Sequence, residues 1–117
     1  MRDHRNLRAF ELADKTALAL YEATRRFPRD EQFGLTSQMR RAAVSVASNI
    51  VEGCARSSEA DFQRFLDMAY GSARELEYHV SLASRLGFLQ KQDSEKLSSL
   101  IEETSKVLHG LMRSFRS

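Results

Sequence analysis

The chain has 117 residues, of which 42% are hydrophobic and 29% charged, a balance typical of one soluble globular domain. A single proline and five glycines argue against an all-β fold, and there is no run of about 18 apolar residues of the kind that crosses a membrane. The net charge of +2 does not by itself require a nucleic-acid partner. The sequence shows no apolar secretory signal, and its one cysteine excludes an internal disulfide. We therefore expect a cytoplasmic protein with a single domain over residues 1–117.

The first predicted helix covers residues 7–27, where apolar side chains recur at steps of three and four. Pro28 ends it, because a proline disfavours helical geometry in the preceding residue. The second helix follows a short connector, with Thr36 as its expected N-cap and Gly53 as its expected end. Its apolar seam consists of Leu35, Met39, Ala42, Val46, Ile50 and Gly53.

The third predicted helix begins after Ser57 or Ser58 and runs to Leu86, with Gly87 as its stop. Gly71 lies within it, in a patch of small residues that we expect to admit a neighbouring backbone. The fourth helix begins near Asp93 and continues toward the C-terminus. Four amphipathic helices with short connectors predict an all-α, up-down-up-down antiparallel four-helix bundle with left-handed packing.

A polar stripe runs beside the seam of the second helix and has counterparts on the third. We predict that it forms a structural polar network in which Arg41 pairs with Glu75 across adjacent helices. A solvated surface and a ligand site are the two alternatives. The residues assigned to the network are Arg41, Ser45, Asn49, Glu52, Ser72 and Glu75.

These motifs resemble the four helix bundle protein family, also called the 23S rRNA intervening sequence protein family. The resemblance rests on Gln38-x-Arg-Arg-Ala-Ala-x-Ser45, Ser48-Asn-Ile-x-Glu-Gly53, Phe62-x-x-Phe-Leu66 and Ala69-x-Gly-Ser72. Phe10 stands where that family usually has tryptophan, and Cys54 where an aromatic or small residue is common.

The resemblance implies a cytosolic bundle that assembles into a ring, usually a homopentamer, and it does not imply an enzyme. Some relatives are encoded inside insertions in large-subunit ribosomal RNA genes. Others resemble the accessory variability determinant of diversity-generating retroelements, which works with RNA. The implied partners are therefore copies of the chain itself and RNA or DNA, with no membrane.

Arginine dominates the basic residues, at 14 of 18, and its planar donors suit phosphates and carboxylates alike. An up-down bundle gathers these arginines at its two ends, where a ring would raise the local potential. Ion pairs with nearby acidic residues are the simpler explanation of most positions. The candidate nucleic-acid contacts are Arg25, Arg26, Arg29, Arg40, Arg56, Arg64, Arg113 and Arg116.

Catalytic and cofactor motifs are absent from the sequence. No glutamate precedes His4, His79 or His109 by three residues, as a di-iron bundle requires, so we expect neither a metal nor another cofactor. Cys54 has no neighbouring base in the sequence, and we interpret it as a small buried spacer. We expect a protein that is not an enzyme.

A protein-interaction scaffold without nucleic-acid binding is the alternative function. In this interpretation a ring presents apolar side chains to another protein. The candidate outward contacts are Leu12, Leu18, Phe33, Phe88 and Leu89, any of which is also suited to a core.

Overall fold

Four α-helices make up most of the computed structural model, which describes residues 1–115. They are α1 (Arg8–Thr24), α2 (Leu35–Cys54), α3 (Glu59–Arg85) and α4 (Lys91–Arg113). Two short 3-10 helices, η1 (His4–Asn6) and η2 (Arg29–Glu31), precede α1 and α2. Residues 1–115 contain no β-strand, which confirms the all-α fold.

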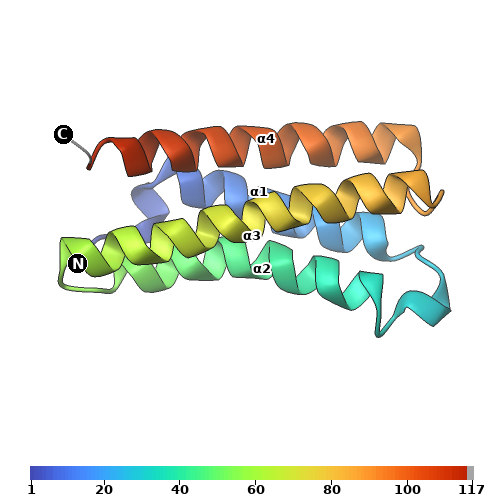
Figure 1. Ribbon diagram of the computed structural model, residues 1–117, viewed down its shortest axis with the longest axis horizontal. Helices are drawn as coiled ribbons and strands as arrows, with labels where there is room; N and C mark the ends of the chain where they lie inside the picture. Colours follow the sequence, from blue (N-terminus) through green and yellow to red (C-terminus); the bar gives the residue numbers. More distant parts are fainter. Residues whose placement is uncertain (116–117) are drawn as a thin grey trace.

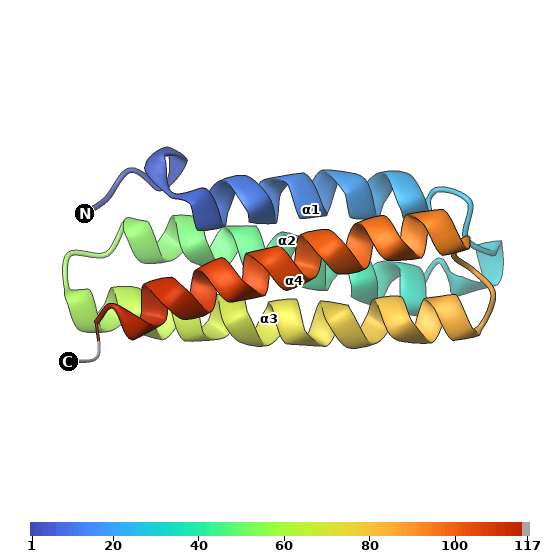
Figure 2. The same cartoon turned by 90° about the horizontal axis from the view of Figure 1, so that it is seen from above.

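The helices lie side by side in an elongated molecule measuring 43 × 23 × 19 Å (Figures 1 and 2). Consecutive helices run in opposite directions (Figure 1), and each of α1 and α3 contacts both α2 and α4. We call the end where α1 and α3 finish and α2 and α4 begin the Pro28 end. The opposite end, where α2 finishes and α3 begins, is the Gly53 end. The left-handed twist of the packing stays a prediction.

The core is divided along the bundle into two clusters of buried side chains. The cluster toward the Pro28 end includes Met39 and Leu76, and the one toward the Gly53 end includes Ile50 and Phe62. All six predicted seam residues of α2 are buried. Periodicity therefore identified the packed face of this helix correctly.

Close contact between α2 and α3 occurs at Gly53, not at Gly71. A Cβ atom added at Gly53 would lie 2.8 Å from the Cβ of Phe65, whereas one at Gly71 would meet nothing within 4 Å. Gly71 itself therefore makes no close contact within the described chain, whereas Ala69 and Ala73 of the same small-residue patch are buried. Gly53, expected as a seam residue and as the helix stop, lets the two helices approach each other.

One predicted helix start is wrong, because the N-cap of α2 is Gly34 and not Thr36. The start of α4 at Lys91 lies close to the predicted start near Asp93. Ser58 caps α3 as expected, since its hydroxyl accepts a hydrogen bond from the Asp61 amide. Gly87 also ends α3 as expected, with a φ of 81° that suits glycine best.

Candidate nucleic-acid interface

The Pro28 end carries arginines that come from three helices and the connector between α1 and α2. Arg25 follows the last residue of α1, Arg29 begins η2, and Arg85 is the last residue of α3. Arg40 lies in the second turn of α2 and reaches back to α1. Its Nε donates to Thr24 Oγ1 at 2.9 Å, and its guanidinium lies 4.6 Å from the centroid of the Tyr21 ring. These contacts hold the Arg40 side chain in place without neutralising its charge.

Most guanidinium groups at the Pro28 end lack a carboxylate partner or have only a solvent-exposed one. Within residues 1–115, no carboxylate oxygen lies within 4.0 Å of Arg29, Arg40 or Arg85. Arg25 pairs with Glu22 at 3.2 Å and Arg26 with Asp93 at 3.5 Å. Exposed pairs of this kind contribute little, so these two arginines can exchange their carboxylates for phosphates.

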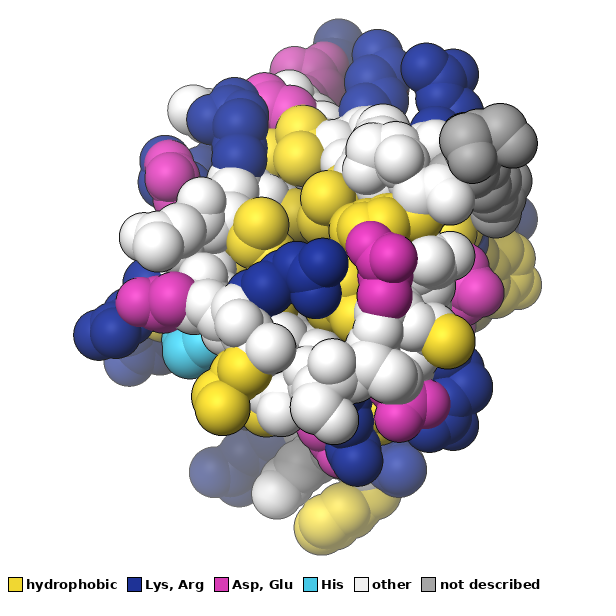
Figure 3. Space-filling model, turned by 90° about the vertical axis from the view of Figure 1, so that its left-hand side faces the viewer, with side chains coloured by type: hydrophobic (Ala, Val, Ile, Leu, Met, Phe, Trp, Pro, Cys, Tyr) yellow, Lys and Arg dark blue, Asp and Glu magenta, His cyan; other side chains and the backbone are white. Residues whose placement is uncertain are grey.

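The arginines of the Gly53 end are paired with carboxylates and aromatic rings. Arg56 lies 2.9 Å from Glu52, and Arg64 lies 3.7 Å from Asp61. Both guanidinium groups also lie over the ring of Phe65. Figure 3 shows this end, where basic and acidic side chains alternate around exposed hydrophobic atoms.

Two further arginines, Arg2 and Arg113, lie at the Gly53 end. Arg2 covers the ring of Phe62, with its guanidinium carbon 4.0 Å from the ring centroid. Arg113 has no carboxylate within 4.0 Å in the described part of the chain. The last candidate contact, Arg116, lies outside the described residues. The predicted contacts therefore differ only in part between the two ends. Arg29 and Arg40 at the Pro28 end have no close carboxylate in the described residues, whereas Arg25 and Arg26 at that end and Arg56 and Arg64 at the Gly53 end each have an ion pair.

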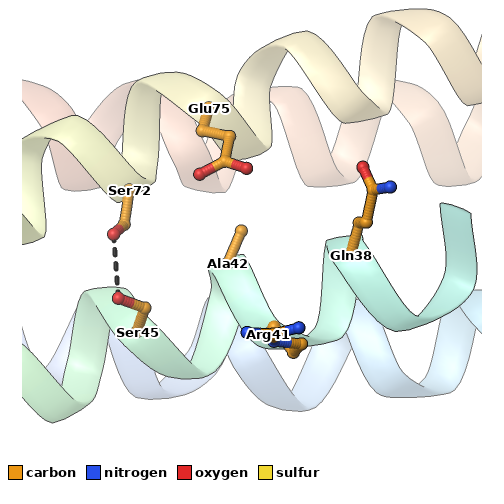
Figure 4. A pocket seen from close by; sticks show the side chains of 6 residues that line it. All are labelled: Gln38, Arg41, Ala42, Ser45, Ser72 and Glu75. Atoms are coloured by element: carbon orange, nitrogen blue, oxygen red, sulfur yellow. Dashed lines mark hydrogen bonds between the residues drawn. The ribbon is translucent and has the colours of Figure 1, made fainter.

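The predicted polar network forms only in part. Ser45 and Ser72 share a hydrogen bond of 2.9 Å between α2 and α3, and Asn49 Nδ2 donates to Ser45 Oγ at 3.0 Å. Arg41 and Glu75 both line an open groove of about 410 Å³ between these helices (Figure 4), but no ion pair joins them.

The partners of the charged network residues differ from the prediction. Glu75 Oε2 instead lies 3.5 Å from Nε2 of His79, and Glu52 pairs with Arg56. Arg41, Glu52 and Glu75 are all exposed. The expected interhelical pair is wrong: Glu75 has a partner one turn away on its own helix, and no carboxylate oxygen lies within 4.0 Å of Arg41 in the described residues.

The groove between α2 and α3 lacks the arrangement that nucleophilic catalysis requires. Its two serine hydroxyls bond to each other, and the nearby carboxylate of Glu75 is directed to His79. Among residues 1–115, no three His, Cys, Asp or Glu side chains come together as metal ligands would. No described helix combines the length and the apolar character needed to cross a membrane.

Two titratable side chains, those of Cys54 and His79, are buried. Burial raises the pKa of the Cys54 thiol, and the Cys54 carbonyl accepts a hydrogen bond of 2.7 Å from the Arg2 amide. Burial lowers the pKa of His79, although the charge of Glu75 acts in the opposite direction. The His79 Nδ1 atom is buried without a hydrogen-bond partner in the described residues. His79 therefore favours the neutral state.

The candidate outward apolar contacts are only partly exposed. Phe33 and Leu18 face solvent, at 91% and 68% exposure, but Leu12 and Leu89 are buried in the core and Phe88 is half-buried. Sequence reasoning missed several other exposed apolar side chains, which interrupt the polar face of α2 and α3. They are Val44, Val51, Met68, Tyr78 and Leu86.

Comparison with known proteins shows the family to which the chain belongs. A crystal structure of a protein with unknown function, from the S23 ribosomal protein family of Bacteroides thetaiotaomicron, has a similar fold. Its TM-score is 0.82 at 23% sequence identity, over 90% of this chain and 95% of that one. No curated protein matches the chain. The model of the 23S rRNA-intervening sequence proteins matches residues 5–110, so the chain belongs to the 23S rRNA-intervening sequence protein family.

Proposed function

We propose that this chain is a non-enzymatic, cytoplasmic protein that assembles with copies of itself and associates with structured RNA through its Pro28 end. The observation that carries the proposal is the group of guanidiniums at this end without close carboxylates. Arg29, Arg40 and Arg85 have no ion pair in the described residues, and Arg25 and Arg26 have only exposed ones. Arginines of this kind bind nucleic acids by displacing counterions from phosphates.

Self-assembly would strengthen such binding, because a ring repeats the same cationic surface around one axis. A ring-like oligomer, a pentamer by the family resemblance, also accounts for the exposed apolar side chains of α2 and α3. Val44, Met68 and Tyr78 are between 40% and 58% exposed in the single chain. Apolar side chains exposed on neighbouring helices favour burial against another protein surface.

The first test measures binding of a labelled RNA stem-loop by fluorescence anisotropy as the salt concentration rises. Three phosphates per chain predict an affinity loss of about 20- to 40-fold between 50 and 200 mM KCl. A DNA hairpin of the same sequence shows whether the 2′-hydroxyls of RNA matter. Binding that is absent, or that does not respond to salt, would reject nucleic-acid association.

The molar mass in solution tests the second part of the proposal. Light scattering on a sizing column should give a discrete multiple of the 13.4 kDa chain mass, and five copies are expected. A folded protein that stays monomeric at high concentration contradicts the ring. This outcome leaves RNA binding by the single chain open to the anisotropy measurement.

A protein-interaction scaffold is the second candidate, and the same exposed apolar side chains favour it. The two functions differ in what happens when nucleic acid is removed. A partner protein that remains bound after nuclease treatment, and is lost when Met68 and Tyr78 are changed to serine, favours the scaffold. A partner released by nuclease favours RNA association.

A further inference from the structure

We propose that Phe33 is a stacking platform for an unpaired nucleobase, and that Arg29 and Arg40 hold the phosphates on either side of that base. This inference rests on the proposed function and deepens it. It names the RNA feature that is recognised, which is a single-stranded segment such as a hairpin loop. Backbone contacts alone would bind paired and unpaired RNA by charge and shape.

The exposure of Phe33 is not explained by the packing of the single chain. Its ring is 91% exposed, whereas Phe27 and Leu35 in the same region are buried. Phe27 packs against Phe88 with ring centroids 5.6 Å apart, so the core at this end is closed without Phe33. An aromatic side chain left in water forgoes about 1.5–3 kcal/mol of burial free energy, which a stacked base would partly recover.

The segment that carries Phe33 is held by its own hydrogen bonds. The Glu31 carboxylate accepts from the Leu35 amide at 3.0 Å, and the Glu31 carbonyl accepts from the Gly34 amide at 3.0 Å. A Cβ atom added at position 34 would lie 2.9 Å from Oε1 of Glu31, so the Glu31 side chain would have to move away from the Leu35 amide. Binding therefore does not require this loop to become ordered first, which favours affinity.

Cationic groups come from both sides of this segment. Arg29 opens η2, four residues before Phe33, and has no carboxylate within 4.0 Å in the described chain. Arg40 lies one and a half turns into α2 and is fixed by Thr24 and the Tyr21 ring. An exposed aromatic ring combined with unpaired guanidiniums at the same end of the molecule is the combination that single-strand-binding proteins use.

The acidic residue Asp30 should oppose phosphate binding, so a substitution that removes its charge should strengthen RNA binding. Asp30 follows Arg29, is exposed, and makes no ion pair in residues 1–115. Removing its charge should strengthen RNA binding about twofold to threefold at low salt, because a like charge near the phosphates is lost. An Asp30→Asn variant that binds more weakly would contradict the assigned position of the phosphates.

The decisive experiment uses an introduced fluorophore, because the chain has no tryptophan. The Phe33→Trp variant is titrated with an RNA stem-loop that has unpaired adenines in its loop. A fully paired duplex of the same length and charge is the control RNA. Stacking should quench the indole saturably with the stem-loop and leave it nearly unchanged with the duplex.

Affinity measurements on exchanged side chains complete the experiment. Phe33→Ala and Phe33→Leu should weaken stem-loop binding about 5- to 100-fold without changing the salt slope, since no charge is lost. Phe33→Tyr should retain binding. Leu18→Ala, which removes an exposed apolar side chain on α1, outside the apolar face of α2 and α3, should have no effect. Circular dichroism should show unchanged helix content, because Phe33 makes no core contact.

The outcomes separate this inference from the proposed function. If Phe33→Ala binds as tightly as the native chain while binding stays salt-dependent, the stacking inference fails and RNA association stands. If the native chain binds no RNA, both fail. If the indole emission shifts to the blue with protein concentration alone and does not respond to RNA, another copy of the chain covers position 33, and the inference fails.

Discussion

The two ends of the bundle bear similar sets of arginines, but they place them in different surroundings. At the Gly53 end the guanidiniums of Arg2, Arg56 and Arg64 lie over aromatic rings and near carboxylates. At the Pro28 end, Arg29 and Arg85 have no carboxylate within 4.0 Å in the described chain. Arginine content alone therefore says little about a binding surface. The distribution of acidic and aromatic neighbours distinguishes a structural arginine from an available one.

The sharpest way to test this contrast is to reverse two charges at each end. Arg25→Glu combined with Arg29→Glu should weaken stem-loop binding about 30-fold at 100 mM KCl, which equals about 2 kcal/mol. The matched control, Arg56→Glu combined with Arg64→Glu, should change affinity by no more than about threefold. Anisotropy titrations on all three proteins provide the comparison. Equal losses at both ends would show that binding follows overall charge.

Packing at the Gly53 end predicts the next largest effect. Gly53→Ala should lower the free energy of unfolding by about 1–2 kcal/mol, because the new methyl group meets the Phe65 Cβ at 2.8 Å. Gly71→Ala, where nothing lies within 4 Å, should raise it by up to about 1 kcal/mol through helix propensity. Urea denaturation measures both. A stabilised Gly53→Ala protein would mean that α2 and α3 separate at little cost.

Removing single arginines should separate structural from available side chains. Arg56→Ala loses the Glu52 pair and the contact with the Phe65 ring, so we expect a loss of about 0.5–1 kcal/mol in stability. Arg29→Ala loses neither kind of contact and should stay within about 0.5 kcal/mol of the native chain. Thermal melts followed by circular dichroism provide the measurement. The contrast fails if Arg29→Ala is the more destabilised of the two.

The smallest expected effect is the pH dependence contributed by His79, which lies on α3 toward the Pro28 end. Its pKa in the folded chain is lower than the ordinary 6.5, so the unfolded chain binds more protons as the pH falls through 6.5. His79 therefore lowers stability between pH 7.5 and 5.5. The His79→Gln variant should lose less stability over this interval than the native chain in parallel urea titrations. Identical slopes would exclude a contribution from His79.

Sequence periodicity predicted the fold well because burial is its direct cause. Every seam residue predicted for α2 is buried, from Leu35 to Gly53. Leu86 was predicted to be the last residue of the third helix and is 53% exposed, because the helix ends at Arg85 and the chain turns at Gly87. Residues at the end of a helix leave the periodic face, and spacing alone does not show where this happens.

The site was less predictable, because the ion pairs of its charged side chains depend on side-chain positions that spacing in the sequence does not determine. Arg41 and Glu75 were correctly placed beside one groove but do not pair. Arg29 has no close carboxylate in the described residues, and the carboxylate of Glu31 in the same short helix instead accepts a hydrogen bond from the Leu35 amide. The exposure of Phe33 had a signal in the sequence, because it lies in a short connector outside both neighbouring apolar seams.

The buried thiol of Cys54 can report local opening of the bundle at the Gly53 end. Cys54 is 1% exposed, and the amide of Arg2 donates a hydrogen bond to its carbonyl. A thiol reagent such as a maleimide reaches a thiol buried to this extent only when the structure around it opens. The rate of Cys54 labelling in native buffer thus measures how often the Gly53 end opens locally, without any engineered probe.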